Sequence, residues 1–385
     1  MPLFIKNILM FLTPIALVFA PAVIVLTASG EFYSTQKVGE LARSRETIVV
    51  GAAYSNTRGD YQLQETFIRK PEVIALGTSR VGGFRAVFFK DPAVFYNDTG
   101  TGGVLSNFRY FLEKVSDNSP KIIIAGMDPY FFSPEEVARN SVVTRPDPFV
   151  AYISPHRPFF EGLFLGGGWW RIYPDYFSDK FSLSDVFGAQ YANTTYIGLR
   201  AVADGNGFLN DGSNYFGDVI SSKEKQQNAR ASIEALAASI SETSGDEYGS
   251  GISPEALAEV RRFLDTTKKQ GSYVIGFIPP LSHAQYERLK EFPNAPYAYA
   301  FKNLGPVLTN LYKEYGYDFY DFTDITAFGG SDSEMVESKH GSEKLYLRMF
   351  IKMAQINKQL GALVDTRYLT KRLQSAESNL VVFPL

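Results

Sequence analysis

Short apolar runs that each end in a polar or glycine-bearing loop recur along the chain and predict buried strands. Five of these runs lie at residues 73–76, 93–96, 121–125, 273–278 and 318–322, and a further strand candidate lies at 47–52. Apolar residues recur at helical spacing at residues 104–115, from Ser253, from about Ala284, at 299–315 and at 343–360. Strands that alternate with helices build a parallel sheet whose connecting loops gather at one edge. We therefore predict an α/β three-layer sandwich with a central, mostly parallel sheet, and we expect any chemistry at that edge.

The longest apolar run lies near the N-terminus. Residues 8–28 form 21 consecutive uncharged positions, preceded by Lys6 and followed by Glu31. At about 1.5 Å per residue this run matches the roughly 30 Å hydrocarbon core of a bilayer. It is longer than the core of a typical cleaved signal peptide, so an uncleaved signal-anchor over residues 1–30 is expected. With Lys6 before the span, the body is expected on the periplasmic side of a bacterial inner membrane, or outside the cell.

The segment 136–252 interrupts the α/β pattern. Its periodicity is weak, apart from a helix predicted over 223–243, and it carries Trp169 and Trp170 among many other aromatic residues. We interpret it as an insertion or cap between the two parts of one domain, residues 31–135 and 253–385. Its tryptophans could stack on sugar rings, lie at lipid headgroups or form a small satellite core.

The composition of the chain limits the kinds of catalytic and metal sites that it can form. The chain has 385 residues, a net charge of -3 and no cysteine, which excludes disulfides, thiol catalysis and thiolate metal sites and gives no sign of a nucleic-acid partner. Its three histidines are His156, His283 and His340, so a multi-histidine metal centre is not expected and any histidine base must be one of them. No metal or other cofactor is expected.

Ser79 is the candidate nucleophile. It follows the apolar run at 73–76 directly, in the turn Gly77-Thr78-Ser79-Arg80, where parallel sheets place their ligands. The alternative is structural, because Thr78 or Ser79 could simply be the N-cap of the next helix.

Four blocks in this order resemble those of the SGNH, or GDSL-like, hydrolases. They are Gly77 to Arg80, Gly100 to Gly103, Gly126-Met127-Asp128, and Glu337-Ser338-Lys339-His340. The resemblance covers roughly residues 70–135 and 270–360. It is greatest to the membrane-anchored branch, which includes proteins like the D-alanyl transfer protein of teichoic-acid assembly and the SGNH-type polysaccharide O-acetylation proteins.

The resemblance implies that Ser79 attacks an acyl carbonyl, that His340 takes its proton, and that Glu337 orients the imidazole. Glu337 replaces the usual Asp and is longer by one methylene, so its carboxylate could lie outside the triad. The implied oxyanion hole comprises Ser79, Gly102, Gly103 and Asp128. Asp128 replaces the usual Asn, and an ionised carboxylate cannot donate a hydrogen bond. Either Asp128 is protonated, or backbone N–H groups suffice, or catalysis is lost.

Other residues at the sheet edge or in the insertion are candidates for substrate binding, namely Arg80, His283, Trp169 and Trp170. His283 is also the second candidate for the base. Together with the apolar span, the resemblance implies a membrane-tethered serine esterase or O-acyltransferase acting on an envelope or exported polysaccharide. The partners that it implies are that glycan or an acyl donor, the membrane, and a membrane-bound acyltransferase. The alternative is a catalytically inactive SGNH-like domain that binds glycan or scaffolds an envelope assembly.

Overall fold

The computed structural model describes residues 3–54, 58–139, 168–188, 194–243 and 248–385. Its contacts divide the chain into two compact units, and neither unit is continuous in sequence. The first unit comprises Met1–Tyr61, Pro148–Asn210 and Tyr215–Gly217, and the second comprises Gln62–Asp147, Asp211–Asn214 and Asp218–Leu385. The sequence pattern did not indicate that residues 31–61 group with residues 148–210.

The second unit contains a five-stranded sheet in which every neighbouring pair of strands is parallel. Its strands are β2 (Val73–Leu76), β3 (Phe95–Asp98), β4 (Ile122–Gly126), β8 (Tyr273–Ile278) and β9 (Asp318–Asp321). All five were predicted from their apolar runs, although β3 starts two residues later than expected. The mixed α/β class and the parallel sheet are thereby confirmed.

Helices cover both faces of this sheet. Successive strand residues point to opposite sides, and apolar side chains on both sides must be buried. On one face, Ile74, Ile123 and Val274 belong to a buried cluster with residues of three helices. On the other face, Val73, Ile124 and Ile275 pack with residues of the C-terminal helices. The first group of helices is α4 (Leu105–Lys114), α13 (Pro254–Gln270) and α16 (Leu304–Tyr315), and the second is α17 (Glu343–Ile356), α18 (Lys358–Ala362) and α19 (Thr366–Ser375).

The order of the strands determines where a site can form. Across the sheet the order is β3-β2-β4-β8-β9, so the first strand of the sheet lies between the second and the third. This is the flavodoxin-like order, and its switch point lies between β2 and β4, where ligands bind beyond the carboxyl ends of the strands. Leu76 at the end of β2 pairs with Asp98 on one side and Ala125 on the other. The loops that follow these three strands therefore start side by side.

The second unit also contains α5 (Pro134–Arg139), α12 (Lys223–Ser239), α14 (His283–Lys290) and α15 (Tyr299–Lys302). Of these, α14 and α15 contribute Leu289, Tyr299 and Ala300 to the first of the two buried clusters. The helix predicted over 299–315 is interrupted at Asn303, which ends α15 and precedes α16. The helix predicted over 343–360 ends at Ile356, because the Asn357 side chain caps a new helix by accepting from the N–H of Leu360 at 2.7 Å.

The first unit has a smaller mixed sheet, of order β5-β1-β6-β7. Strand β1 (Ile48–Val50) pairs in parallel with β5 (Thr195–Ile197) and antiparallel with β6 (Asn206–Leu209), while β7 (Asn214–Phe216) forms the edge. Its helices are α1 (Leu3–Ala28), α2 (Thr35–Ser44), α8 (Gly168–Phe177), α9 (Leu183–Gly188) and α10 (Leu199–Asp204). Helix α3 (Arg58–Arg69) leads into the second unit, and the short α11 (Gly217–Ser221) precedes α12.

Helix α1 contains the predicted apolar span. Within the described residues, no single straight helix is long and apolar enough to cross a bilayer. The two halves of α1, Phe4–Pro14 and Ala16–Ala28, meet at 53° and satisfy length and composition together. The C-terminal end of α1 is instead part of the protein core, because Ala22, Val25 and Leu26 are buried in a cluster of the first unit.

Candidate active site

Ser79 lies at the switch point of the parallel sheet, immediately beyond β2. It is the first residue of a short 3-10 helix, Ser79–Val81, and its side chain is exposed. The residue that caps this helix is Thr78, whose hydroxyl oxygen accepts from the N–H of Arg80 at 3.1 Å. The Ser79 hydroxyl is thus not needed as the cap and can take part in other hydrogen bonds.

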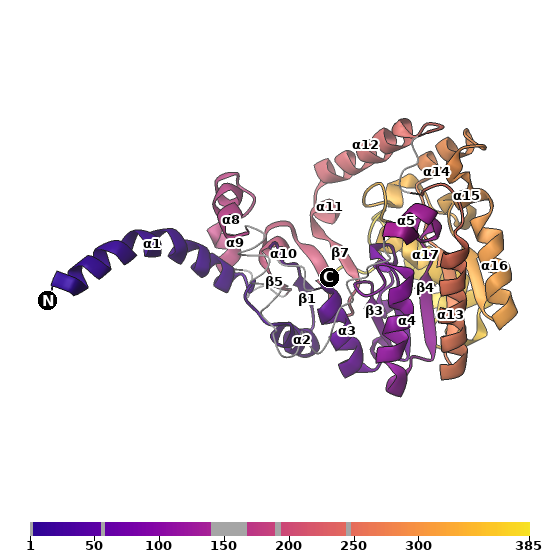
Figure 1. The fold of residues 1–385 in the computed structure, drawn as a ribbon, viewed down its shortest axis with the longest axis horizontal. Coiled ribbons are helices and arrows are strands. Elements are labelled where there is room, and N and C mark those ends of the chain that lie inside the picture. The colour runs from indigo at the N-terminus through magenta and orange to yellow at the C-terminus, as the bar shows by residue number, and fades with distance from the viewer. Residues whose placement is uncertain (1–2, 55–57, 140–167, 189–193, 244–247) are drawn as a thin grey trace. The chain divides into compact units, whose positions relative to one another are not determined.

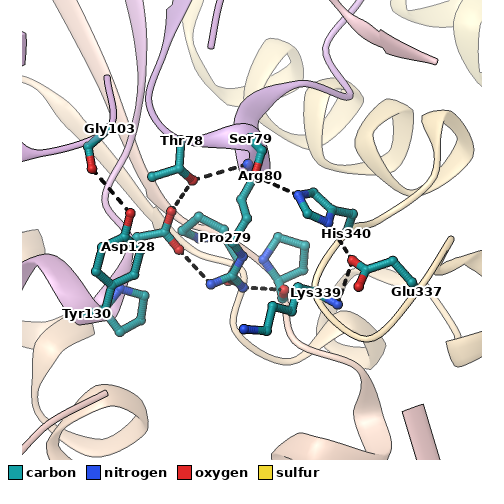
Figure 2. A network of polar contacts seen from close by, with 12 residues as sticks. Thr78, Ser79, Arg80, Gly103, Asp128, Tyr130, Pro279, Glu337, Lys339 and His340 are labelled. Carbon is teal, nitrogen blue, oxygen red and sulfur yellow. Dashed lines mark hydrogen bonds and ion pairs between the residues drawn. The ribbon is translucent and has the colours of Figure 1, made fainter. Parts of the chain in front are cut away.

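The Ser79 hydroxyl lies 2.7 Å from Nε2 of His340, and Nδ1 of His340 contacts Oε1 of Glu337 (Figure 2). The three side chains therefore form a chain of hydrogen bonds although Ser79 is 261 residues from His340. The extra methylene of Glu337 does not keep its carboxylate away from the imidazole. The three residues that the sequence assigned to a triad are brought together.

A tight loop before α17 presents Glu337 and His340. The N–H of Val336 donates to the carbonyl of His340 at 2.9 Å, and the N–H of Lys339 donates to Oε1 of Glu337 at 3.0 Å. Immediately after the loop, the Ser342 side chain accepts from the N–H of Leu345 at 3.4 Å and caps α17. These local bonds hold a carboxylate and an imidazole three residues apart on the same side of the loop.

The environment keeps the Glu337 carboxyl ionised. Partial burial raises its pKa, but the hydrogen bond and charge of His340 and bonds from Lys339 and Ser338 outweigh that effect and hold the pKa below its usual value. An ionised Glu337 accepts a hydrogen bond from protonated Nδ1, which leaves Nε2 as the acceptor for the Ser79 hydroxyl. This is the tautomer that a general base requires.

Backbone N–H groups beside Ser79 are available to stabilise an oxyanion. In the part of the chain that the structure describes, the N–H groups of Ser79, Gly102 and Gly103 donate to no protein acceptor. The loop after β3 also lies close to the serine turn, because a Cβ on Gly102 would be 2.5 Å from the nitrogen of Gly77. Gly103 is exposed, and its carbonyl accepts from the Tyr130 hydroxyl at 3.3 Å.

Asp128 does not have the geometry of an oxyanion donor. Its side chain is 1% exposed, and Oδ1 accepts from Nη1 of Arg80 at 2.6 Å. Its other oxygen accepts from the Thr78 hydroxyl (Figure 2). Both oxygens of the carboxyl group are thereby engaged by side chains of the serine turn. The expectation that Asp128 contributes to the oxyanion hole is therefore corrected: it holds the loop that carries Ser79.

Arg80 likewise does not point toward a substrate. Its buried guanidinium donates to the carbonyl oxygens of Pro280 at 2.7 Å and Pro279 at 3.3 Å, in addition to Asp128. Arg80 thereby joins the loops that follow β2, β4 and β8. Its predicted role in substrate binding is replaced by a role in positioning.

The other predicted residues lie apart from this chain of hydrogen bonds. His283 begins α14, and its Nδ1 contacts Asp324 at 3.4 Å and Glu287 at 4.0 Å. Trp170 belongs to α8 in the first unit and is 60% exposed. The side chain of Trp169, like all of His156, lies outside the described residues.

Several supporting contacts were not found from the sequence. The Asn214 side chain donates to the carbonyl of Ser79 at 3.0 Å, the Thr99 hydroxyl donates to the carbonyl of Thr78 at 2.5 Å, and the Tyr346 hydroxyl donates to the carbonyl of Arg80. Only Thr99 lies near a recognisable motif. Asn214 comes from the segment interpreted as an insertion, and no local pattern marks it.

The described residues contain no group of three or more His, Cys, Asp or Glu side chains arranged to hold a metal ion. What the arrangement can do chemically is activate a serine hydroxyl next to backbone hydrogen-bond donors. Comparison of the chain with protein-family models, with curated proteins and with solved structures gave no match.

Proposed function

We propose that this chain is an SGNH-type serine esterase or O-acyltransferase, tethered to a bacterial inner membrane with its body on the outer side. The observation that carries the proposal is the hydrogen-bonded chain Ser79–His340–Glu337, with an ionised Glu337. Its location beyond the carboxyl ends of parallel strands adds support, because open α/β sheets bind their ligands there.

In the first half of the reaction the Ser79 oxygen attacks the carbonyl carbon of an acyl ester while Nε2 of His340 takes the hydroxyl proton. The carbonyl oxygen becomes an oxyanion, for which the N–H groups of Ser79, Gly102 and Gly103 are the available donors. The ester C–O bond then breaks, and the imidazolium returns the proton to the departing alcohol. Glu337 stabilises the imidazolium throughout this half-reaction.

The second half regenerates the serine. Water or a sugar hydroxyl loses a proton to His340 and attacks the acyl-serine carbonyl, and the proton passes to the Ser79 oxygen as it leaves. Water as acceptor makes the protein an esterase, and a sugar hydroxyl makes it an acyltransferase. A polysaccharide substrate, and an acyl donor supplied by a membrane-bound acyltransferase, follow from the resemblance to the membrane-anchored SGNH proteins.

The membrane location is supported by the apolar composition of α1 and by the exposure of its side chains. Phe4, Met10, Phe11 and Leu17 are between 66% and 73% exposed, which a buried core helix would not show. Lys6 before the span favours an outside location for the rest of the chain.

A fluorophosphonate probe tests the catalytic proposal directly, since it reacts with activated serines. The wild type should be labelled, and Ser79→Ala and His340→Ala should each lose most labelling because the serine and the base act as a unit. His283→Ala is the matched histidine control and should retain labelling. Hydrolysis of a small acetyl ester should follow the same ranking.

If folded wild-type protein showed neither labelling nor ester hydrolysis, the proposal that it is an enzyme would be rejected. The ion-paired Asp128, at the position of the family's oxyanion donor, would then favour the alternative of a catalytically inactive SGNH-like domain that binds glycan. Retained labelling in Ser79→Ala would instead show that another serine is the nucleophile.

A further inference from the structure

Helices α8 and α9 of the first unit expose a set of large apolar side chains, which we call the aromatic patch. The exposed fractions are 60% for Trp170, 39% for Tyr176, 78% for Phe177, 42% for Leu183 and 51% for Phe187. Trp170 and Phe177 are seven residues apart on α8, and Leu183 and Phe187 are four apart on α9, so each pair shares one helix face. Exposed apolar groups gathered in this way mark an interaction surface.

Helices α8 and α9, which carry the aromatic patch, lie beside the C-terminal half of α1 (Figure 1). Ala22, Val25 and Leu26 of α1 share a buried cluster with Ile172 of α8 and Val186 of α9. The Tyr173 hydroxyl also donates to the carbonyl of Val18. Helices α8 and α9 are thus packed directly against the apolar helix, and their buried sides face it while the patch residues remain exposed.

The contact with Val18 places α8 at a definite depth if α1 crosses a bilayer. A hydrocarbon core of roughly 30 Å needs about 20 residues at about 1.5 Å each. From Ala22 onward α1 buries Ala22, Val25 and Leu26 in the first unit, so the part of the helix that is available to hydrocarbon ends near Pro21. Val18 lies about one turn before that end, so a side chain that contacts it lies just inside the boundary between hydrocarbon and headgroups.

The composition of the patch suits that boundary. Tryptophan and tyrosine are enriched at membrane–water interfaces because their rings are apolar and their N–H or O–H groups are polar. The ionisable side chains on and between these helices are mixed in sign: Arg171 and Lys180 accompany Asp175, Asp179 and Asp185. A bilayer contact here would therefore depend on apolar burial and not on anionic lipid.

We propose that the aromatic patch of α8 and α9 lies in the headgroup region of the same bilayer that α1 enters. The inference rests on the membrane location proposed above and is independent of catalysis. The patch gives the first unit a second membrane contact besides α1, which fixes how this unit meets the membrane surface.

The chain offers a built-in probe, since Trp169 and Trp170 are its only two tryptophans. The full chain should be reconstituted in neutral phosphatidylcholine vesicles that contain lipids brominated at a shallow or a deep acyl position. We expect a blue-shifted tryptophan emission, quenched more by shallow than by deep bromines and weakly by aqueous iodide. The variants Trp169→Phe and Trp170→Phe assign the signal to one ring. Adding anionic lipid or salt should leave the quenching unchanged.

The double variant Phe177→Ser, Phe187→Ser should lower quenching by bromolipid and raise quenching by iodide, while the protein stays bound to vesicles through α1. Ile356→Ser, which changes a residue of the second unit that is 59% exposed, is the matched control and should have no effect. Tryptophans that iodide quenches fully and bromolipid does not, in protein that is bound to vesicles, would overturn the patch proposal alone. Failure of the full chain to bind vesicles would overturn the membrane location as well.

Discussion

Asp128 lies at the position that the SGNH resemblance assigns to an oxyanion donor, but its contacts with Arg80 and Thr78 indicate a different role. Its carboxylate compensates the charge of Arg80 in a site where both side chains are almost fully buried. We predict that Asp128→Asn lowers the free energy of unfolding by about 3 kcal/mol, because it leaves a buried guanidinium without a counter-charge. Urea unfolding measures the stability, and fluorophosphonate labelling should fall as the Ser79 loop loosens.

The double variant Arg80→Gln, Asp128→Asn supplies the control. It removes both charges. Its loss of unfolding free energy should therefore be smaller than the sum of the losses measured for Arg80→Gln and Asp128→Asn separately. An increase in esterase activity on Asp128→Asn would contradict this account. It would show that the amide acts as the missing oxyanion donor and that the ion pair is dispensable.

The stability that Glu337 contributes should depend on pH, and the direction follows from its lowered pKa. Since the pKa of Glu337 is lowered in the folded protein, its ionised form contributes stability at pH values above the usual glutamate pKa. That contribution is lost as the pH falls through the lowered folded value. The stability difference between wild type and Glu337→Gln should therefore shrink as the pH is lowered below about 4, which chemical unfolding at several pH values can measure.

The same substitution tests how Glu337 acts on the proposed base. In Glu337→Gln the imidazolium that forms as Ser79 reacts has no anionic partner, so the rate of fluorophosphonate labelling should fall. An unchanged rate would mean that Glu337 does not act on His340.

At the scale of single residues, the sequence predicts the proposed triad and not the residues that support it. Ser79, His340 and Glu337 could be named because each lies in a short motif that resembles an SGNH block. Asn214 and Tyr346 contact the serine loop through side chains that are 135 and 266 residues away from their acceptors. Such contacts depend on the finished fold, and a polar residue at either position has many structural explanations.

At the scale of elements, the approach of the loop after β3 to the serine turn is the feature with the sharpest consequence. Gly102→Ala should be destabilising and should lower labelling, because its Cβ would lie 2.5 to 2.7 Å from backbone atoms of Gly77. Gly103→Ala is the matched control for stability, since a Cβ there would meet nothing within 4 Å. Thermal unfolding compares the two variants, and equal stability would show that the loops can separate without cost.

Strands β2, β3, β4 and β8 of the large sheet could be predicted because each is a short run buried on both faces, which leaves an apolar signature. Strand β9, at the edge of the sheet, is only partly buried. The strands of the small sheet leave a much weaker signature. β5 and β7 are three residues long and only partly buried, and β1 pairs with segments about 150 residues away. The break at Asn303 was missed because apolar spacing continues across it.

At the scale of the whole molecule, each of the two units is built from segments that are separate in the sequence. Residues 31–61 precede the strands of the large sheet in sequence, but their contacts group them with residues 148–210. Segments that are adjacent in sequence are normally assigned to the same domain. No local pattern in the sequence indicates that residues 31–61 group with a distant segment instead. The consequence is that α1 is attached to the unit that does not contain Ser79, and α1 also contributes Ala22, Val25 and Leu26 to the core of that unit.

The orientation of the whole chain can be tested with reporters fused after Leu385. Lys6 lies near the start of α1, before the uncharged run 8–28, so the positive-inside tendency keeps the N-terminus in the cytoplasm and exports the rest. A phosphatase that is active only after export should therefore be active, and a reporter that needs the cytoplasm should be silent. Lys6→Glu should weaken this asymmetry, whereas Lys37→Glu, beyond the span, should not. Cytoplasmic activity of the wild-type fusion would place Ser79 away from any exported glycan and would remove the polysaccharide from the proposal, while leaving the chemistry of the triad to be judged by labelling alone.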